Sequence, residues 1–295
     1  MLFPFMAILL KLAYPYIFSF FSHLRGTGIR AVYCISTATY FAKLPTEDTF
    51  EYIKEAGANI CEVFMDTFSE YTPEFGRLFK ENSEKYGVKV YSVHASNLNY
   101  EPNLNNPTKR ARDDSEVFYR QVLANGRLLN AKSYTYHGGT RLKRRQYTFD
   151  FEKLGKRIEE LCGIAKEYGI DMSYETVHWA YFSYPEFFEN LEKFSPSVKC
   201  TLDIKQVMQA GLNYRDFLPA MEGRINNVHL TDYDENGNIL RPGKGIVDYY
   251  DLFSRLKGIG YDGPMMIELY SGNYDKYSDV KDCVDYLNDI LGKVK

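Results

Sequence analysis

The sequence predicts an α/β fold, a single (β/α)8 TIM barrel preceded by an apolar N-terminal extension. From Ile29 onward, short apolar runs alternate with amphipathic stretches, and the pair repeats at intervals of roughly 33 residues. Eight such pairs occur, which is the number that a closed barrel needs. The apolar runs are nearly continuous, so we expect parallel strands that are covered by helices. A doubly wound sheet is disfavoured because no glycine-rich phosphate turn follows the first strand.

Residues 1–28 differ in composition from the rest of the chain. The first 21 residues are apolar enough to approach a membrane span, yet Lys11 lies among them and Pro4 and Pro15 interrupt them. No basic residue precedes the apolar run, as a signal peptide would require. We rank three interpretations: an extension outside the fold, including a start-site artefact; a membrane anchor or weak signal; and a segment packed on the domain. The barrel is expected to occupy residues 29–295.

The predicted strands are short, apolar and rich in β-branched residues. They span residues 31–35, 59–64, 89–93, 133–136, 171–174, 199–202, 226–230 and 265–267. Helical spacing of apolar residues predicts helices at 46–56, 73–86, 109–129, 149–168, 185–194, 214–221, 247–259 and 278–291. Several helices end at glycines that suit a left-handed cap: Gly57, Gly87, Gly169 and Gly260. No linker-like stretch divides the domain.

Composition narrows the class of protein. Hydrophobic residues make up 45% and charged residues 25%, which is ordinary for a globular protein with a sizeable core. The net charge of -3 argues against a general nucleic-acid binder, because phosphate backbones attract basic surfaces. The cysteines are odd in number, widely spaced and mostly in apolar patterns: Cys34, Cys61, Cys162, Cys200 and Cys283. We therefore expect reduced core cysteines and a cytoplasmic protein, with membrane association through residues 1–21 left open.

Side chains able to bind a metal lie where the predicted strands end. They are Glu62 within the second strand, and His94, His137, Glu175, Asp203, His229, Asp232 and Glu268 at later strand ends. In a barrel, the carboxyl ends of all strands meet at one face, where active sites lie. Taken singly, such a histidine is more often a packing residue and such a carboxylate is often a helix cap. Glu62 alone would be expected to pair with a cation inside the barrel.

Four of these residues together predict a metal site. Glu175, Asp203, His229 and Glu268 would place three carboxylates and one imidazole around one small space. Unpaired buried carboxylates repel one another, and a divalent cation removes that cost. Oxygen-rich ligation with one imidazole suits Mn, Mg or Co at least as well as Zn. We therefore expect one divalent metal ion at this face.

Other charged and aromatic residues are weaker candidates for substrate binding. Arg141, Lys143, Arg144 and Arg145 follow the fourth strand and could bind a phosphate, although a loop of like charges is usually only solvated. Lys205 is closer to the expected site and is a better candidate for binding an anion. Trp179 follows Glu175, and either forms an apolar wall for a sugar or packs within its loop.

The ordered set of motifs is similar to that of a known family. The motifs are VHA at His94, HGG at His137, the strand-five Glu175, LDIKQ at Asp203, NVHLTD at His229, and RPGKG followed by GYDGPMMIEL. Over about residues 29–293 the chain resembles the xylose isomerase-like TIM barrels. This sugar phosphate isomerase/epimerase group includes ketose 3-epimerases, inosose dehydratases and endonuclease IV.

The resemblance implies roles for individual residues. Glu175, Asp203, His229 and Glu268 would bind the metal, and Glu175 and Glu268 would also be the catalytic acid/base pair. The remaining implied positions contact or lie near the substrate: His94, His137 and Arg241. In the endonuclease, the counterparts of the two histidines bind additional zinc. Oligomers are frequent in the family, so a homo-oligomer is an expectation from the resemblance alone.

Two departures from the family pattern bear on function. Gln206 stands where the family usually has a histidine that contacts the sugar, so the identity of the substrate stays open. Residues 238–241 replace an Asp/His pair that completes the three-zinc site of the endonuclease. The incomplete site and the acidic net charge both argue against phosphodiester cleavage.

The expected function is a metal-dependent isomerase or epimerase acting on a sugar or sugar phosphate, with no nucleic-acid partner. Two glutamates would move a proton through an enediolate intermediate, and the position of reprotonation would decide between epimer and isomer. Loss of water from a similar enediolate would give an inosose dehydratase-like lyase. Less favoured alternatives are an endonuclease-like metal hydrolase and a sugar-binding barrel without catalysis.

Overall fold

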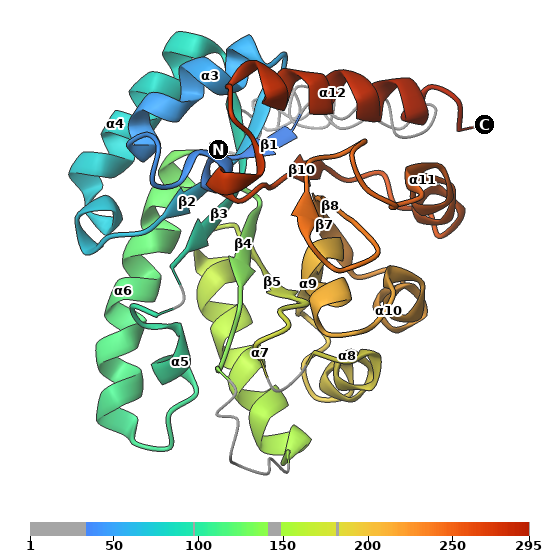
Figure 1. Cartoon of the computed structure of the whole chain (residues 1–295). Coiled ribbons are helices and arrows are strands. Elements are labelled where there is room, and N and C mark those ends of the chain that lie inside the picture. The colour runs from blue at the N-terminus through green and yellow to red at the C-terminus, as the bar shows by residue number, and fades with distance from the viewer. Residues whose placement is uncertain (1–33, 97, 141–148, 181–182, 295) are drawn as a thin grey trace, which may run out of the picture.

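The computed structural model describes residues 34–96, 98–140, 149–180 and 183–294 (Figure 1). Eight parallel strands close into a barrel in the order β1-β10-β7-β6-β5-β4-β3-β2. They are β1 (Cys34–Ser36), β2 (Ile60–Met65), β3 (Lys89–Ala95), β4 (Ser133–Tyr136), β5 (Asp171–Glu175), β6 (Lys199–Asp203), β7 (Ile225–Leu230) and β10 (Met265–Ile267). The predicted TIM barrel is confirmed, and each predicted strand overlaps an observed one. The extension 1–28 and the basic residues of 141–145 lie outside the described residues.

Helices surround the barrel and follow the strands in sequence (Figure 1). They are α3 (Thr49–Glu55), α4 (Pro73–Tyr86), α6 (Lys109–Leu128), α7 (Phe151–Glu167), α8 (Pro185–Glu192), α10 (Tyr214–Met221), α11 (Tyr249–Gly258) and α12 (Ser278–Leu291). Each predicted helix overlaps one of them. Helix α4 shows why glycine marks the ends: its cap residue Gly87 has a left-handed φ of 66°, which costs glycine little.

Short elements at the carboxyl ends of the strands are not predicted by the sequence. Helix α5 (Glu101–Leu104) follows β3, helix α9 (Ile204–Gln209) follows β6, and β8 (Asp232–Tyr233) pairs with β9 (Ile239–Leu240) in a hairpin after β7. Helix α9 begins directly after Asp203, whose carboxylate accepts a hydrogen bond from the Gln206 N–H at 3.0 Å. This N-cap turns the chain back over the barrel, so that α9 lines the active-site face.

The interior of the barrel is polar, whereas the apolar core lies between strands and helices. Large side chains such as Tyr134, Tyr174 and Phe187 are fully buried in that outer layer. Inside the barrel, Glu62 of β2 contacts side chains from β1, β3, β4 and β7, all of them buried. A buried polar layer needs complete hydrogen bonding, and here it forms the floor of the site described below.

Two further expectations concern cysteines and the membrane. All five cysteines are buried and none forms a disulfide with another of them, in agreement with their interpretation as reduced core residues. Within the described ranges, no helix combines the length and the apolar composition that a membrane crossing requires.

Candidate metal centre and active-site cavity

The four predicted metal ligands meet at the carboxyl end of the barrel. Asp203 of β6 is the register partner of His229 of β7, and Glu268 follows β10, which pairs with the other side of β7. His229 Nδ1 lies 2.8 Å from Glu268 Oε2, 3.1 Å from Glu175 Oε1 and 3.7 Å from Asp203 Oδ2. One ligand atom from each residue lies within 4.8 Å of the others, and all four residues are buried. The structure therefore brings together the predicted set.

The charges and hydrogen bonds of this centre fit a divalent cation. Asp203 Oδ2 is buried and accepts no hydrogen bond from the described residues, which is costly for a carboxylate oxygen. Burial lowers the pKa of His229, but the carboxylates of Glu268 and Glu62 outweigh burial and hold that pKa well above its ordinary value. The imidazole is thus protonated where a cation would otherwise sit. A metal ion would replace that proton and satisfy the unpaired oxygen.

Glu62 lies directly beneath the centre and orients two imidazoles. Its carboxylate accepts hydrogen bonds from Ser36 Oγ, Ser92 Oγ, Thr135 Oγ1 and Asn227 Nδ2. Its Oε1 lies 3.2 Å from His94 Nδ1 and 3.4 Å from His229 Nε2. Burial raises the pKa of Glu62, but the charges of His229 and His94 lower it by more, so the pKa lies well below its ordinary value and the carboxyl group is ionised. The cation expected beside Glu62 is therefore a pair of histidines rather than a lysine or arginine.

His94 and His137 form a second group with Glu175. Their Nε2 atoms are 2.7 Å apart, and His137 Nε2 lies 3.3 Å from Glu175 Oε2. The ligand atoms of this trio also lie within 4.8 Å of one another. Both histidines thus stand beside the first centre, as the sequence predicted, where they could hold another cation or contact a substrate.

Glu101, at the start of α5, is a functional residue that the sequence analysis missed. Its Oε2 accepts hydrogen bonds from the backbone N–H and from Nδ1 of His137, each at 3.0 Å. The hydroxyl of Tyr134 donates to Oε1, and Tyr100 bonds to Tyr134 at 2.7 Å. Burial alone lowers the pKa of His137, but Glu101 outweighs it and raises that pKa to about 9. Glu101 therefore fixes the orientation of His137 from behind.

A cavity of about 250 Å³ opens above the centre. Its polar walls come from His94, Ser96, His137, Glu175, Lys205, Gln206 and Glu268. Its mouth is apolar, with Phe41, Leu98 and Tyr270 each at least 45% exposed. Such a mixed lining suits a small polar molecule that has carbon-bound hydrogens on its surface.

Of the remaining candidates for substrate binding, Gln206 and Trp179 lie at or near the cavity, whereas Arg241 forms an ion pair away from it. Gln206 lines the cavity, and its Oε1 accepts from the backbone N–H and Nδ1 of His178 at 3.1 and 2.5 Å. Trp179 packs on His137 with ring centroids 5.7 Å apart. Arg241 instead pairs with Asp279 of α12 at 2.6 Å and does not line the cavity.

Asp232 does not join the metal centre, although it follows β7 and lies close to His229 in the sequence. Its carboxylate accepts four backbone N–H bonds of 2.9 to 3.1 Å, from Tyr233, Gly243, Gly245 and Val247. A carboxylate that accepts this many N–H groups has no free oxygen for a metal. Asp232 therefore anchors the glycine turn after β9, a structural role that is neither metal binding nor the capping of a helix.

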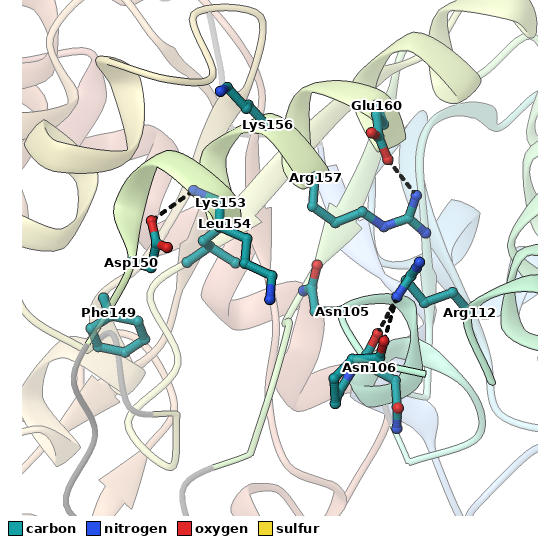
Figure 2. A pocket seen from close by; sticks show the side chains of 11 residues that line it. Asn105, Asn106, Arg112, Phe149, Asp150, Lys153, Leu154, Lys156, Arg157 and Glu160 are labelled. Carbon is teal, nitrogen blue, oxygen red and sulfur yellow. Dashed lines mark hydrogen bonds and ion pairs between the residues drawn. The ribbon is translucent and has the colours of Figure 1, made fainter. Parts of the chain in front are cut away.

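A larger cavity of about 500 Å³ lies away from this chemistry, between the α5–α6 connection and α7 (Figure 2). Its guanidinium groups already have partners. Arg112 donates to the carbonyls of Asn106 and Pro107 at 2.7 and 3.0 Å, and Arg157 binds Glu116 and Glu160. Arg112 thus ties the α5–α6 loop to α6, and Arg157 ties α7 to α6 through Glu116, so both guanidinium groups serve the fold.

Solved structures share the architecture at low sequence identity. A D-tagatose 3-epimerase-like protein matches with a TM-score of 0.73 at 20% identity, covering 88% of this chain and 98% of that chain. An IolI protein with a bound zinc atom matches with a TM-score of 0.71 at 17% identity, covering 89% of this chain and 98% of that chain. D-psicose 3-epimerase from Clostridium cellulolyticum H10 matches with a TM-score of 0.68 at 16% identity, covering 88% of this chain and 98% of that chain. At these identities the likeness establishes the fold.

Sequence comparisons establish the family. The uncharacterized protein MJ1614 of Methanocaldococcus jannaschii is 29% identical over 219 residues, which cover 72% of this chain and 81% of that protein. A family model described as a xylose isomerase-like TIM barrel matches residues 50–290, most of the chain. The closed barrel of parallel strands agrees with that match. The chain therefore belongs to the xylose isomerase-like TIM barrel family.

Proposed function

We propose that this protein is a divalent-metal-dependent isomerase or epimerase of a sugar or sugar phosphate. The observation that carries the proposal is the placement of Glu175 and Glu268 on either side of His229, at 3.1 and 2.8 Å from its Nδ1. In the barrel order, β5 and β10 are separated by β6 and β7, so the two carboxylates enter the cavity from different sides. The names of the epimerases that share the fold support the same reaction class.

The proposed mechanism uses these two glutamates as acid and base. A metal held by Glu175, Asp203, His229 and Glu268 would polarise the substrate carbonyl and make the adjacent C–H more acidic. One glutamate takes that proton, the C–H electron pair forms the carbon–carbon double bond, and the carbonyl π pair moves to oxygen. The other glutamate returns a proton. Return to the same carbon from the opposite face gives an epimer. Return to the neighbouring carbon, with transfer of the hydroxyl proton to the former carbonyl oxygen, gives an isomer.

Other cavity residues would bind and orient the substrate. His178 holds Oε1 of Gln206, so the Gln206 amide group is fixed and its NH2 remains as a donor toward a sugar oxygen. His94 and His137 provide polar contacts on the opposite wall, and Trp179 supports His137. Lys205 is the candidate for an anionic oxygen. Arg241 would have to leave Asp279 before it could contact a substrate.

A nuclease function finds no support in the geometry. Residues 238–241, which replace the Asp/His pair, include strand β9 of a hairpin, and Gln206 is bonded to His178. Among the described residues, neither belongs to a group of side chains that could hold a metal. A three-metal site for phosphodiester cleavage is therefore incomplete in this chain.

Solvent-proton exchange tests the proposed function directly. Purified protein with added Mn²⁺ or Co²⁺ is incubated with a panel of ketoses and ketose phosphates in heavy water, and deuterium incorporation is followed by NMR. We expect incorporation at the carbon beside the carbonyl, abolished in Glu175→Gln and Glu268→Gln and retained in the surface control Glu84→Gln. Absence of exchange on the whole panel would reject the ketose proposal. Water loss from inososes would then point to a dehydratase.

A further inference from the structure

Lys205 is a buried cation inside the cavity and directly beside the metal ligands. Its side chain is only 3% exposed, and Nζ lies 3.3 Å from Asp203 Oδ2 and 3.5 Å from Glu268 Oε2. A buried ammonium is costly unless it is paired, and these two carboxylates pair it. Lys205 therefore sits where the oxygens of a bound substrate would approach the metal ligands.

Lys205 has N–H donors that a substrate can use. Its ammonium carries three N–H groups and forms ion pairs with Asp203 and Glu268 at 3.3 and 3.5 Å, and these contacts do not occupy all three donors. The ring of Tyr270 lies 4.5 Å from Nζ, in a cation–π contact. Tyr270 also lines the cavity mouth. Lys205 and Gln206 both line the same cavity, so a substrate bound there can accept a hydrogen bond from the ammonium.

The charge of the centre allows both Lys205 and a metal ion. Four carboxylates gather here, those of Glu62, Glu175, Asp203 and Glu268. A dication and one ammonium together still leave a net negative charge with neutral imidazoles. Lys205 therefore does not replace the metal. Lys205 contacts two of the proposed metal ligands, Asp203 and Glu268, and it lines the cavity in which a substrate would bind.

We propose that Lys205 is a catalytic residue whose ammonium donates a hydrogen bond to the substrate oxygen that becomes negatively charged in the enediolate. This inference rests on the proposed function. As the C–H proton moves to Glu175 or Glu268, the carbonyl electron pair moves to oxygen, and Lys205 stabilises that oxygen without giving up a proton. A hydrogen-bond donor that points at the oxygen where negative charge develops lowers the activation free energy of the reaction more than it strengthens substrate binding.

Position distinguishes this role from recognition of a substrate phosphate. A phosphate on a sugar lies several bonds from the reacting carbonyl, whereas Nζ is within 3.5 Å of oxygens from two metal ligands. An ammonium in this position would contact the reacting oxygens of the substrate, which bind beside the metal ligands, rather than a distant phosphate. The substrate class that follows is an α-hydroxycarbonyl compound, with or without a phosphate.

A small hydroxamate tests the inference without turnover. Acetohydroxamate presents two adjacent oxygens and a negative charge, as a cis-enediolate does, so its affinity for Mn²⁺-saturated protein is measured by calorimetry. Lys205→Met should weaken binding roughly 10- to 100-fold, because a charge-assisted hydrogen bond is lost. Lys205→Gln, which keeps a neutral donor, should lose less. The surface control Lys80→Met should bind like the wild type.

Kinetics of proton exchange complete the test. Lys205→Met should reduce kcat by roughly 100-fold with a smaller change in KM, as for loss of one oxyanion donor. Hydroxamate affinity that stays within threefold of wild type in both folded variants would overturn the inference. A rise in KM confined to phosphorylated ketoses would overturn it as well. If the wild type exchanges no ketose proton, the proposed function fails, yet the hydroxamate comparison still decides the role of Lys205.

Discussion

His94 and His137 face each other with their Nε2 atoms 2.7 Å apart. Behind His137, Glu101 Oε2 lies 3.0 Å from Nδ1, and behind His94, Glu62 Oε1 lies 3.2 Å from Nδ1. The carboxylate of Glu101 favours a proton on Nδ1 of His137. Burial lowers the pKa of His137, but the charge of Glu101 outweighs it and raises that pKa to about 9. His137 therefore carries a positive charge near neutral pH in the metal-free protein.

This arrangement predicts that the metal-free protein loses stability as pH rises toward 9. The pKa of His137 is raised from 6.5 to about 9, so its contribution is fully present below pH 6.5 and disappears as pH passes through 9. Glu101→Gln removes the charge that causes this shift. Urea unfolding from pH 6 to 10 should show a smaller pH-dependent loss in the variant, by an amount on the order of 2 kcal/mol. An identical pH profile in both proteins would refute the role of Glu101.

Metal binding is predicted to release protons. Near pH 7 the imidazole of His229 is protonated in the metal-free protein, because Glu268 and Glu62 hold its pKa well above the ordinary value. Only the neutral imidazole binds a metal, so apparent affinity should rise by up to about tenfold per pH unit for each proton displaced. Calorimetry of Mn²⁺ binding in buffers of different ionisation enthalpy measures the number released. If no proton is released at pH 7, metal binding does not displace a proton from His229.

Asp232 is predicted to stabilise the fold rather than the metal. Asp232→Ala leaves four backbone N–H groups without their carboxylate, and should cost about 3 kcal/mol in the free energy of unfolding. Mn²⁺ affinity of the folded variant should stay near that of the wild type. Asp234→Ala, in the exposed part of the same loop, is the matched control with a smaller effect. Loss of metal binding from a stable Asp232→Ala protein would reverse this assignment.

Gly245 in the same turn and Gly163 in helix α7 offer a matched comparison. A Cβ at Gly245 would lie 2.2 Å from the Tyr233 carbonyl oxygen and 2.4 Å from Asp232 Oδ1, so Gly245→Ala must displace the turn. A Cβ at Gly163, within α7, would meet no atom within 4 Å. Gly163→Ala should therefore stabilise the protein by roughly 0.5 to 1 kcal/mol, whereas Gly245→Ala destabilises it by more than that. Thermal unfolding compares the two, and equal effects would contradict the close packing at Gly245.

The repeat of strands and helices could be predicted from the sequence because each unit has a strong local signal. Near-continuous apolar runs mark the strands, and helical spacing marks the segments between them. The cluster of Glu175, Asp203, His229 and Glu268, the proposed metal ligands, could be predicted from the same pattern, since barrel topology fixes where strand ends meet. Asp232 has the same local signal as a ligand, and only the path of the following turn shows that its oxygens are used by backbone N–H groups.

Features that depend on loops could not be predicted in this way. Glu101 lies in a four-residue helix after β3, where no periodic pattern indicates that it reaches back to His137. Helix α9 is only six residues long and continues the apolar run of β6, so its start at Ile204 is hidden. The direction of Lys205 and the bond between Gln206 and His178 both follow from that helix. These contacts join residues far apart in sequence, which local preferences do not encode.

If Glu175, Asp203, His229 and Glu268 hold one functional metal ion, metal-free protein should bind Mn²⁺ at one tight site per chain. Calorimetric titration with Mn²⁺ measures this binding. We expect the affinity to fall at least about 100-fold in Asp203→Asn and His229→Gln, and to stay unchanged in the surface variant Glu84→Gln. Absence of a tight site in the wild type, or full binding in both ligand variants, would contradict this prediction.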